Sequence, residues 1–184
     1  MSRLWILTAV GKDRPGIVAR VTKILYERGG NLEDSAMTRL AGEFAIMLIF
    51  SAPRRLSQAR LEQAFRGLSR QLKLAIHLKP LTGAERTLRR AGKPYLLSVY
   101  GADRPGIVYR VSALLASLNV NITDVSTHRT MSTKTKAAKP LYLMALEVEL
   151  PSRLDVNRLE KRLKTLAKEL DVRVNVRSAE APVL

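Results

Sequence analysis

An aspartate, a proline and a glycine stand at a fixed spacing where a strand-like stretch gives way to a helix-like one. Residues 11–21 read GKDRPGIVARV, so Asp13 precedes Pro15 and Gly16. The fixed φ of proline suits the first turn of a helix, aspartate can cap the exposed N–H groups there, and glycine lets another group approach the backbone closely. Because a helix N-terminus presents free N–H groups and the positive end of the helix dipole, this pattern predicts a carboxylate site.

An asparagine extends the same site. Asn31 begins the next strand-like stretch, and its side-chain amide offers the donors and the acceptor that a zwitterionic amino acid requires. The set recurs at an offset of 90 as Asp103, Pro105, Gly106 and Asn121. A purely structural interpretation stays open, in which the aspartate caps a helix and the asparagine forms a turn. Repetition does not decide between the two, because a duplicated fold duplicates its caps.

The whole chain consists of two such copies. They align at an offset of 90 as far as Asn31 and Asn121, and then at an offset of 98, which pairs Phe44 with Tyr142. The difference of 8 residues (98 − 90) lies around 131–139, a lysine-rich polar segment that we interpret as a long hairpin loop. We predict a first domain over 1–80, a linker over 81–93 and a second domain over 94–184.

Hydrophobic periodicity predicts the same six elements in each copy. The stretch RLWILTAV is strand-like, NLEDSAMTRLAGEFAIMLIFSA reads as two strands that turn near Ala41 and Gly42, and alternating residues over 74–78 predict a last strand. Two stripes at helical spacing separate the strands. They are Ile17, Val18, Val21, Ile24 and Leu25, and then Leu61, Phe65, Leu68 and Leu72. The predicted fold class is therefore α+β, with two tandem ferredoxin-like βαββαβ domains whose antiparallel sheets carry helices on one face.

Composition and charge limit the function. The chain has 184 residues, of which 46% are hydrophobic and 26% charged, as in ordinary globular proteins. It has no cysteine, no signal peptide and no apolar run of eighteen residues or more, so we expect a cytoplasmic protein without a membrane span. The net charge is +16, with +10 (17 − 7) up to Gly92 and +6 (15 − 9) after it. This spread excess either attracts polyanions without specificity or is simply a solvated basic surface.

Few residues of the sequence support an enzymatic activity or the specific binding of nucleic-acid bases. His77 and His128 stand at non-equivalent positions of the two copies, and neither belongs to a motif with the spacing of metal ligands. Asp13 and Glu33 could form a pair of carboxylates, but the sequence supplies no nucleophile or metal with which such a pair would catalyse a reaction. We therefore predict no enzyme, no metal and no cofactor. Aromatic residues make up only 5%, and the third strands, EFAIMLIF and LYLMALEV, lack the aromatic motif of RNA-binding sheets. Direct nucleic-acid binding through charge alone stays open but is not favoured.

The motifs resemble a known family. DRPGIV…GGNLEDS and DRPGIV…NVNITDV are similar to the signature of ACT domains, small regulatory modules that bind amino acids. The resemblance covers nearly the whole chain as two tandem ACT domains, with no catalytic domain attached. Together with the two-domain length, DRPGIVARVT and GGNLEDSAMTRLAGEFAIML most resemble the glycine cleavage system transcriptional repressor family.

The resemblance implies an amino acid held between ACT domains whose sheets join side by side, within the chain or in a homo-oligomer. It implies glycine as the ligand, with serine or another small amino acid as the alternative. It also implies a protein partner, such as a DNA-binding transcriptional activator, through which glycine cleavage genes are regulated. The implied ligand contacts are Asp13, Arg14, Pro15, Gly16, Ile17 and Asn31, with Asp103, Arg104, Pro105, Gly106, Ile107 and Asn121 in the second copy.

Two features fall outside that signature. The lysine-bearing segment 131–139 and the high positive charge have no counterpart in it, and they leave room for a different partner surface. The alternatives to an amino-acid sensor are accordingly a charge-driven nucleic-acid-binding protein or an interaction module without a ligand.

Overall fold

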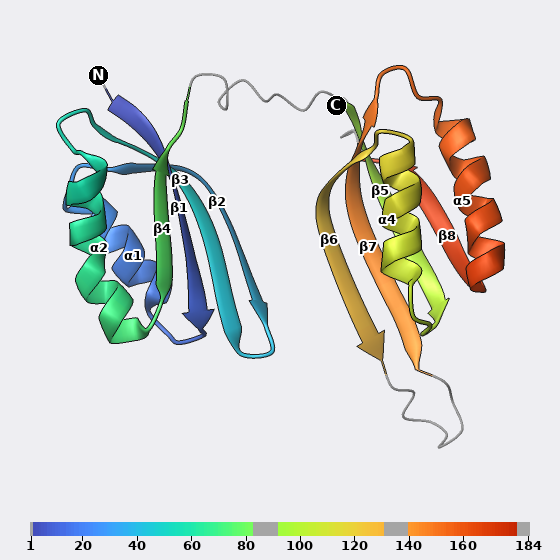
Figure 1. Ribbon diagram of the computed structural model, residues 1–184, viewed down its shortest axis with the longest axis horizontal. Coiled ribbons are helices and arrows are strands. Elements are labelled where there is room, and N and C mark those ends of the chain that lie inside the picture. Colours follow the sequence, from blue (N-terminus) through green and yellow to red (C-terminus); the bar gives the residue numbers. More distant parts are fainter. Residues whose placement is uncertain (1, 83–91, 131–139, 180–184) are drawn as a thin grey trace, which may run out of the picture. The chain divides into compact units, whose positions relative to one another are not determined.

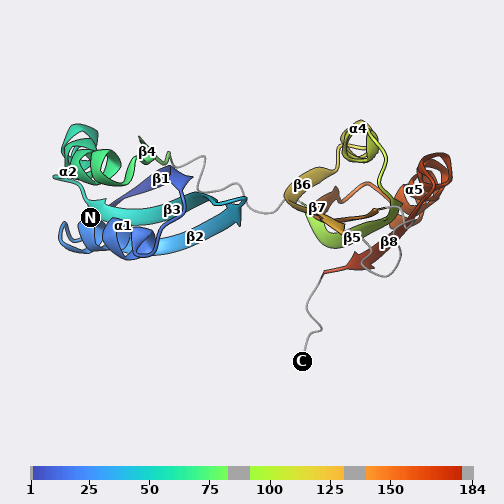
Figure 2. The ribbon, with the colours of Figure 1, turned by 90° about the horizontal axis from the view of Figure 1, so that it is seen from below.

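The computed structural model describes residues 2–82, 92–130 and 140–179, which form two units of the same design (Figure 1). Each unit has a four-stranded sheet in which every paired strand is antiparallel, and two helices cover one face of that sheet (Figure 2). The predicted α+β fold with two tandem βαββαβ domains is confirmed. The N-terminal domain contains β1 (Ser2–Lys12), α1 (Ile17–Tyr26), β2 (Asn31–Leu40), β3 (Glu43–Pro53), α2 (Gln58–Leu72) and β4 (Ala75–Pro80).

The C-terminal domain repeats this order of elements. Its sheet has the strand order β6-β7-β5-β8, which matches β2-β3-β1-β4 in the N-terminal domain. Both sheets therefore place the second strand of the domain at an edge. The elements are β5 (Gly92–Ala102), α4 (Ile107–Ser117), β6 (Asn121–Thr130), β7 (Leu141–Pro151), α5 (Val156–Leu170) and β8 (Val172–Ser178).

A tight turn joins β2 to β3 at the predicted place. Ala41 has φ 49° and Gly42 has φ 82°, so both central residues of this two-residue hairpin lie in the left-handed region. Positive φ at both positions is the mark of a type I′ turn, whose twist matches that of the flanking strands. The turn sets the register in which Leu40 lies opposite Glu43. A bulge between Leu32 and Asp34 then shifts the register by one residue, so that Asn31 lies opposite Ser51.

The helix stripes form the two cores with one systematic exception. Ile17, Val21 and Leu25 of α1 are buried against the sheet, and so are their counterparts in α4. Val18, which the periodicity placed on the same face, is 40% exposed, and Val108 is 43% exposed. A residue one step along a helix is rotated by about 100°, so the valine after each buried isoleucine turns away from the sheet. Both valines stand in the first turn of their helices.

The α2 and α5 stripes are buried through most of their length. The buried residues are Leu61, Phe65, Leu68 and Leu72 in α2, and Leu159, Leu163, Ala167 and Leu170 in α5. Among the described residues, none of the helices combines the length and the apolar composition that a membrane span requires.

Two predicted segments fall largely outside the described residues. These are the lysine-rich segment 131–139 and positions 83–91 of the predicted linker 81–93. At the end of that linker, Gly92 and Lys93 already belong to β5, because they continue the ladder with β7 opposite Pro151 and Leu150.

Candidate ligand-binding loops

Two loops carry the predicted anion sites, and both have the same backbone geometry. Loop 1 (residues 13–16) joins β1 to α1, and loop 2 (residues 103–106) joins β5 to α4. Gly16 has φ 90° and ψ 0°, and Gly106 has φ 91° and ψ −2°. These angles are those of the third residue of a type II turn, a position that requires positive φ, and proline is favoured just before it. Pro15 and Pro105 occupy that preceding place.

This turn makes one local prediction wrong. Pro15 does not stand in the first turn of the helix, because α1 begins at Ile17 with Gly16 as its N-cap. No side chain caps this N-terminus with a hydrogen bond, so Asp13 is not the predicted cap either. The positive φ of Gly16 inserts a turn between the aspartate and the helix, which moves the carboxylate away from the first helical N–H groups. The same description holds for Gly106 and α4.

The aspartate of each loop binds an arginine of the edge strand instead. In loop 1 a carboxylate oxygen of Asp13 lies 3.3 Å from a guanidinium nitrogen of Arg39 in β2. In loop 2 a carboxylate oxygen of Asp103 lies 2.7 Å from Nε of Arg129 in β6. Sequence reasoning missed both arginines, although the offset of 90 that relates the loops also relates them (129 − 39).

Backbone hydrogen bonds hold the loops as well. The N–H of Asp13 donates to the carbonyl of Gly42 at 2.9 Å, and the N–H of Asp103 donates to the carbonyl of Pro140 at 3.1 Å. Each aspartate therefore ties its loop to the connection between the second and third strands of the domain. The carboxylate serves to position the loop, and the helix N-terminus stays free of a side-chain cap.

The space over the loop glycine is open. A Cβ added to Gly16 or to Gly106 would meet no other atom within 4 Å. Ile17 and Ile107, which the family resemblance includes among the contacts, bury their side chains in the cores with 2% exposure. They can therefore offer a ligand only their backbone N–H groups, which the first turn of a helix leaves without an intrahelical acceptor.

Asn31 does not lie near loop 1 of its own domain. It lies opposite Ser51 at the end of β3, whereas Lys12, next to the loop, lies opposite Glu43 at the start of β3. Eight residues of extended strand separate these positions (51 − 43), which is about 27 Å at the usual rise of a strand. In the second copy, Asn121 lies opposite Glu149 and Ala102 opposite Leu141, with the same separation.

The arginines of the two loops differ in their partners. Arg104 of loop 2 donates to Asp171, with 2.7 Å between a guanidinium nitrogen and a carboxylate oxygen. At the offset of 98 the counterpart of Asp171 is Lys73, so Arg14 of loop 1 has a cation where Arg104 has a carboxylate. The backbones agree there, since a Cβ on Gly11 would meet the carbonyl of Lys73 at 2.9 Å and one on Gly101 would meet that of Asp171 at 2.9 Å.

A half-buried tyrosine, Tyr142, lies opposite Gly101 in the neighbouring strand, close to loop 2. The hydroxyl of Tyr142 is buried without a hydrogen-bond partner among the described residues, and Phe44 holds this position in the first copy. Burial raises the pKa of Tyr142 above its usual value of 10.0, and the negative charge of Asp103 raises it further. The Thr127 hydroxyl lies close enough to lower the pKa of Tyr142 and so partly offsets this rise, although it does not meet the geometry of a hydrogen bond.

The described residues contain no group of three or more histidine, cysteine or acidic side chains that could hold a metal ion. His77 lies in β4 and His128 in β6, where the ring of His128 is 3.2 Å from the hydroxyl of Ser126.

Comparison with known proteins links this geometry to a family. The sequence model of the ACT domain matches residues 3–79 and 93–177. Over 183 residues the chain is 28% identical to the glycine cleavage system transcriptional repressor of Escherichia coli (strain K12), covering 93% of this chain and 87% of that protein. An unknown protein from Galdieria sulphuraria has a similar structure, with a TM-score of 0.82 and 25% identity over 97% of this chain and 99% of that one.

A further solved structure, provisionally described as a glycine cleavage system transcriptional repressor, supports the fold. It aligns with a TM-score of 0.69 at 20% identity, over 96% of this chain and 97% of that chain.

Proposed function

Because the chain belongs to the ACT domain family, we propose that it is a regulatory protein that senses a small amino acid and acts by binding rather than by catalysis. The observation that carries this proposal is the open N-terminus of α1. Loop 1 holds no side-chain cap there, and a Cβ on Gly16 would meet no other atom within 4 Å. A carboxylate placed there would accept hydrogen bonds from free N–H groups at the positive end of the helix dipole.

The ligand-binding residues that we propose follow from this placement. The backbone of Gly16 and Ile17 binds the carboxylate of the amino acid, and Asp13 holds the loop in position through Arg39. Arg14 supplies a second cation for the carboxylate. Asn31 or Asn121 supplies the amide that pairs with the amino group and the remaining carboxylate oxygen. The corresponding backbone of loop 2 is that of Gly106 and Ile107, next to Arg104 and Asp103.

The two loops are not equivalent in our proposal, and loop 1 is the stronger site. Arg104 already donates to Asp171, so a ligand at loop 2 would compete with an existing ion pair. Arg14 faces no such competitor from the equivalent position, where Lys73 adds a positive charge instead. We therefore expect one amino acid to bind per chain at low ligand concentration.

The asparagine has to come from another copy of the domain. Within one domain, loop and asparagine are about 27 Å apart along the sheet, which is several times the length of a small amino acid. The edge position of β2, whose residues are all exposed, supports side-by-side pairing as the means of bringing them together. A paired edge would also cover the backbone groups that an exposed strand leaves without partners.

The relationship to the Escherichia coli repressor suggests the physiological setting. We propose glycine as the ligand, with serine as the alternative, and control of glycine cleavage genes as the role. A protein partner such as a DNA-binding transcriptional activator would transmit the signal. Ligand and partner would then be linked, so that each changes the affinity of the chain for the other by the same factor.

Binding of nucleic acid through the net charge of +16 is the competing function. The sheet faces that no helix covers present few aromatic rings on which nucleic-acid bases could stack. Of the aromatic residues in the described strands, Tyr100 lies on such a face, and Arg173 already stacks over its ring at 5.8 Å. RNA-binding sheets instead present several aromatic rings for base stacking.

Calorimetric titration with glycine and then serine, at near-physiological salt, tests the proposal. We expect saturable binding that Arg14→Gln weakens and that the matched variant Arg104→Gln leaves unchanged. Comparison of Asn31→Ala with Asn121→Ala then identifies the domain that supplies the amide. Absence of binding by any amino acid would reduce the loops to structural turns.

A further inference from the structure

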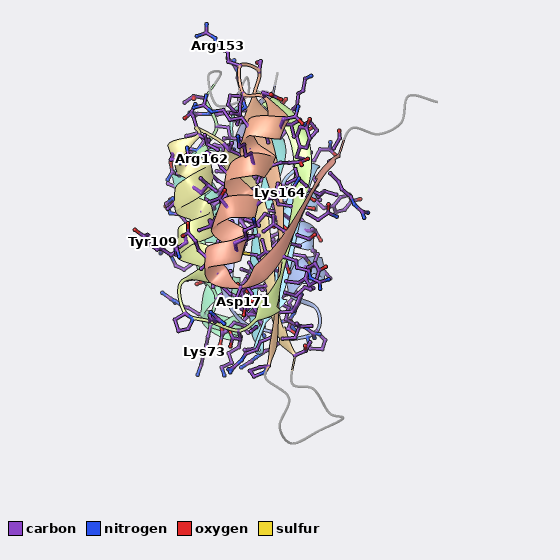
Figure 3. All side chains as sticks on the ribbon, turned by 90° about the vertical axis from the view of Figure 1, so that its right-hand side faces the viewer. Lys73, Tyr109, Arg153, Arg162, Lys164 and Asp171 are labelled. Atoms are coloured by element: carbon purple, nitrogen blue, oxygen red, sulfur yellow. The ribbon has the colours of Figure 1, made fainter. Side chains whose placement is uncertain are left out.

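A groove runs between the two helices of the C-terminal domain, and at one end it reaches the first turn of α4, next to loop 2. Its volume is about 510 Å³, and both helices contribute to its lining. Figure 3 shows α4 and α5 side by side, with Tyr109 projecting from α4, Arg162 on the side of α5 next to α4, and Lys164 on the other side. The lining residues on which the argument depends are Tyr109, Arg110, Leu114, Lys161, Arg162 and Leu166.

The floor of this groove is apolar and its rim is basic. Leu114 and Leu166 lie in the floor, and the ring of Tyr109 is 76% exposed beside them. Glu169, the acidic residue of the lining, forms an ion pair with Arg110. Lys161 and Arg162 have no acidic partner among the described residues, so the groove carries two uncompensated positive charges.

The first copy provides an internal comparison, because its helices pack in the same way but carry different residues. At the offset of 90 the counterpart of Tyr109 is Ala19, and at the offset of 98 the counterparts of Lys161 and Arg162 are Gln63 and Ala64. The pair formed by Arg110 and Glu169 has a counterpart in the first copy, where Arg20 donates a hydrogen bond to the side chain of Gln71 at 3.1 Å. The second copy thus differs from the first by an exposed aromatic ring and by two cations on α5, whereas the first copy has Lys23 in place of Ala113 and Gln71 in place of Glu169.

The basic residues outside the groove show no such difference. Arg158, Lys164 and Lys168 of α5 correspond to Arg60, Arg66 and Arg70 of α2. A positively charged outer helix is therefore common to both domains, and it accounts for part of the net charge of +16. Within the groove, by contrast, Lys161 and Arg162 of α5 have no cationic counterpart in α2.

We propose that this groove binds an acidic amphipathic helix of a protein partner. Leucine-sized side chains from the partner would fill the floor, and its carboxylates would pair with Lys161 and Arg162. This is the helix-in-groove mode, in which anchors spaced by three or four residues enter an apolar channel. The inference rests on the proposed function only in its expectation of a protein partner.

The charges on the described residues argue against two other occupants. Each of the four described helices carries a net positive charge, so a helix from a second copy of this chain would be repelled by the rim. A nucleic acid would find the cations but would leave the apolar floor without a matching group, and Tyr109 is the one aromatic ring that lines the groove. Single-stranded nucleic acids are instead bound by several stacking rings along a basic track.

Fluorescence polarisation with a labelled synthetic peptide tests the proposal on the full chain. The probe is a helical peptide of about 15 residues, roughly 22 Å long, with leucine at every third or fourth position and glutamate on both flanks. The test variant combines Tyr109→Ala, Lys161→Gln and Arg162→Ala, the residues of the first copy. The matched control combines Arg158→Gln and Lys168→Gln, which removes the same number of charges outside the groove.

We expect the test variant to weaken peptide binding by at least about tenfold, because exposed tyrosine and arginine side chains often dominate such interfaces. The control variant should change it by about twofold or less. Equal binding by the wild type and the test variant, or no binding at all, would overturn the proposal. Binding of a single-stranded oligouridine that is lost in the test variant, without peptide binding, would make the occupant a nucleic acid and overturn it too.

A glycine titration of the test variant separates this inference from the proposed function. The substituted residues lie outside the loops, so the affinity for glycine should stay as in the wild type. Loss of peptide binding with unchanged glycine binding supports the groove. Absence of glycine binding in the wild type would count against the proposed function and leave the peptide result standing.

Discussion

Lys73 controls, in our interpretation, whether loop 1 can bind a carboxylate. Lys73 has φ 53° and its counterpart Asp171 has φ 56°, so both sit in the left-handed region at the end of a helix. Aspartate tolerates this conformation well, and Lys73→Asp should cause no additional backbone strain. The substitution gives Arg14 the acidic partner that Arg104 already has, and it should therefore weaken ligand binding at loop 1.

The size of the effect follows from the exposure of the existing pair. The side chains of Arg104 and Asp171 are 49% and 70% exposed, and a pair of this kind contributes at most about 1 kcal/mol. A ligand that has to displace it loses up to about fivefold in affinity. Replacing the lysine charge by a carboxylate costs about 0.5 kcal/mol more per charge unit at roughly 8 Å in water. Lysine to aspartate changes the charge by two units, so together these contributions give at most about 2 kcal/mol, or about thirtyfold. Salt screening reduces the decrease to about tenfold.

Calorimetry of three variants separates the two contributions. Lys73→Gln removes the cation without supplying a partner, and we expect about a twofold loss. Lys73→Asp should lose about tenfold, and the loss should shrink as the salt concentration rises. Asp171→Lys should release Arg104 and raise the stoichiometry towards two ligands per chain. If Lys73→Asp binds glycine as tightly as the wild type does while Arg14→Gln abolishes binding, pairing at this position does not control the site.

Three further substitutions test the surroundings of the loops. Ala41→Asn should raise the free energy of unfolding by about 0.5–1 kcal/mol in urea denaturation, because asparagine accepts the φ of 49° better than alanine, and Ala41→Gly serves as the control. Tyr142→Phe should leave stability unchanged or raise it by up to about 1 kcal/mol, since it removes a buried hydroxyl without a hydrogen-bond partner; a larger loss would show that the hydroxyl is satisfied. Arg39→Gln should change stability by less than about 1 kcal/mol, yet weaken glycine binding by releasing Asp13; unchanged affinity would remove this tether from the site.

The order of the elements could be predicted because hydrophobic spacing is a local property. Leu61, Phe65, Leu68 and Leu72 follow one face of a helix, and the same spacing recurs in the second copy, so two separate stretches of sequence predict the same element. The turn at Ala41 and Gly42 was predictable for a similar reason, since it interrupts two strand-like runs. Each of these features depends on residues close together along the chain.

The details of the loops depended on residues far apart in the chain, and there the sequence prediction failed. Asp13 before Pro15 looked like a helix cap, yet the positive φ of Gly16 starts the helix later and leaves the carboxylate to Arg39. The partner stands 26 positions away on an edge strand, where no local pattern marks it. Its signal was the internal repeat, because Asp13 with Arg39 and Asp103 with Arg129 share one offset.

Differences between the two copies carry more information about function than their similarities do. Both copies need the buried helix stripes, the loop glycine and the aspartate–arginine pair, since each of these maintains the fold or the loop. Lys73 against Asp171 and Ala19 against Tyr109 serve no such need, because either residue fits the same backbone. Fold stability leaves these positions free to differ. In our proposal the first difference leaves Arg14 available to a ligand, and the second adds an aromatic ring to the groove that binds a protein partner, so the duplicated fold would separate sensing from partner binding.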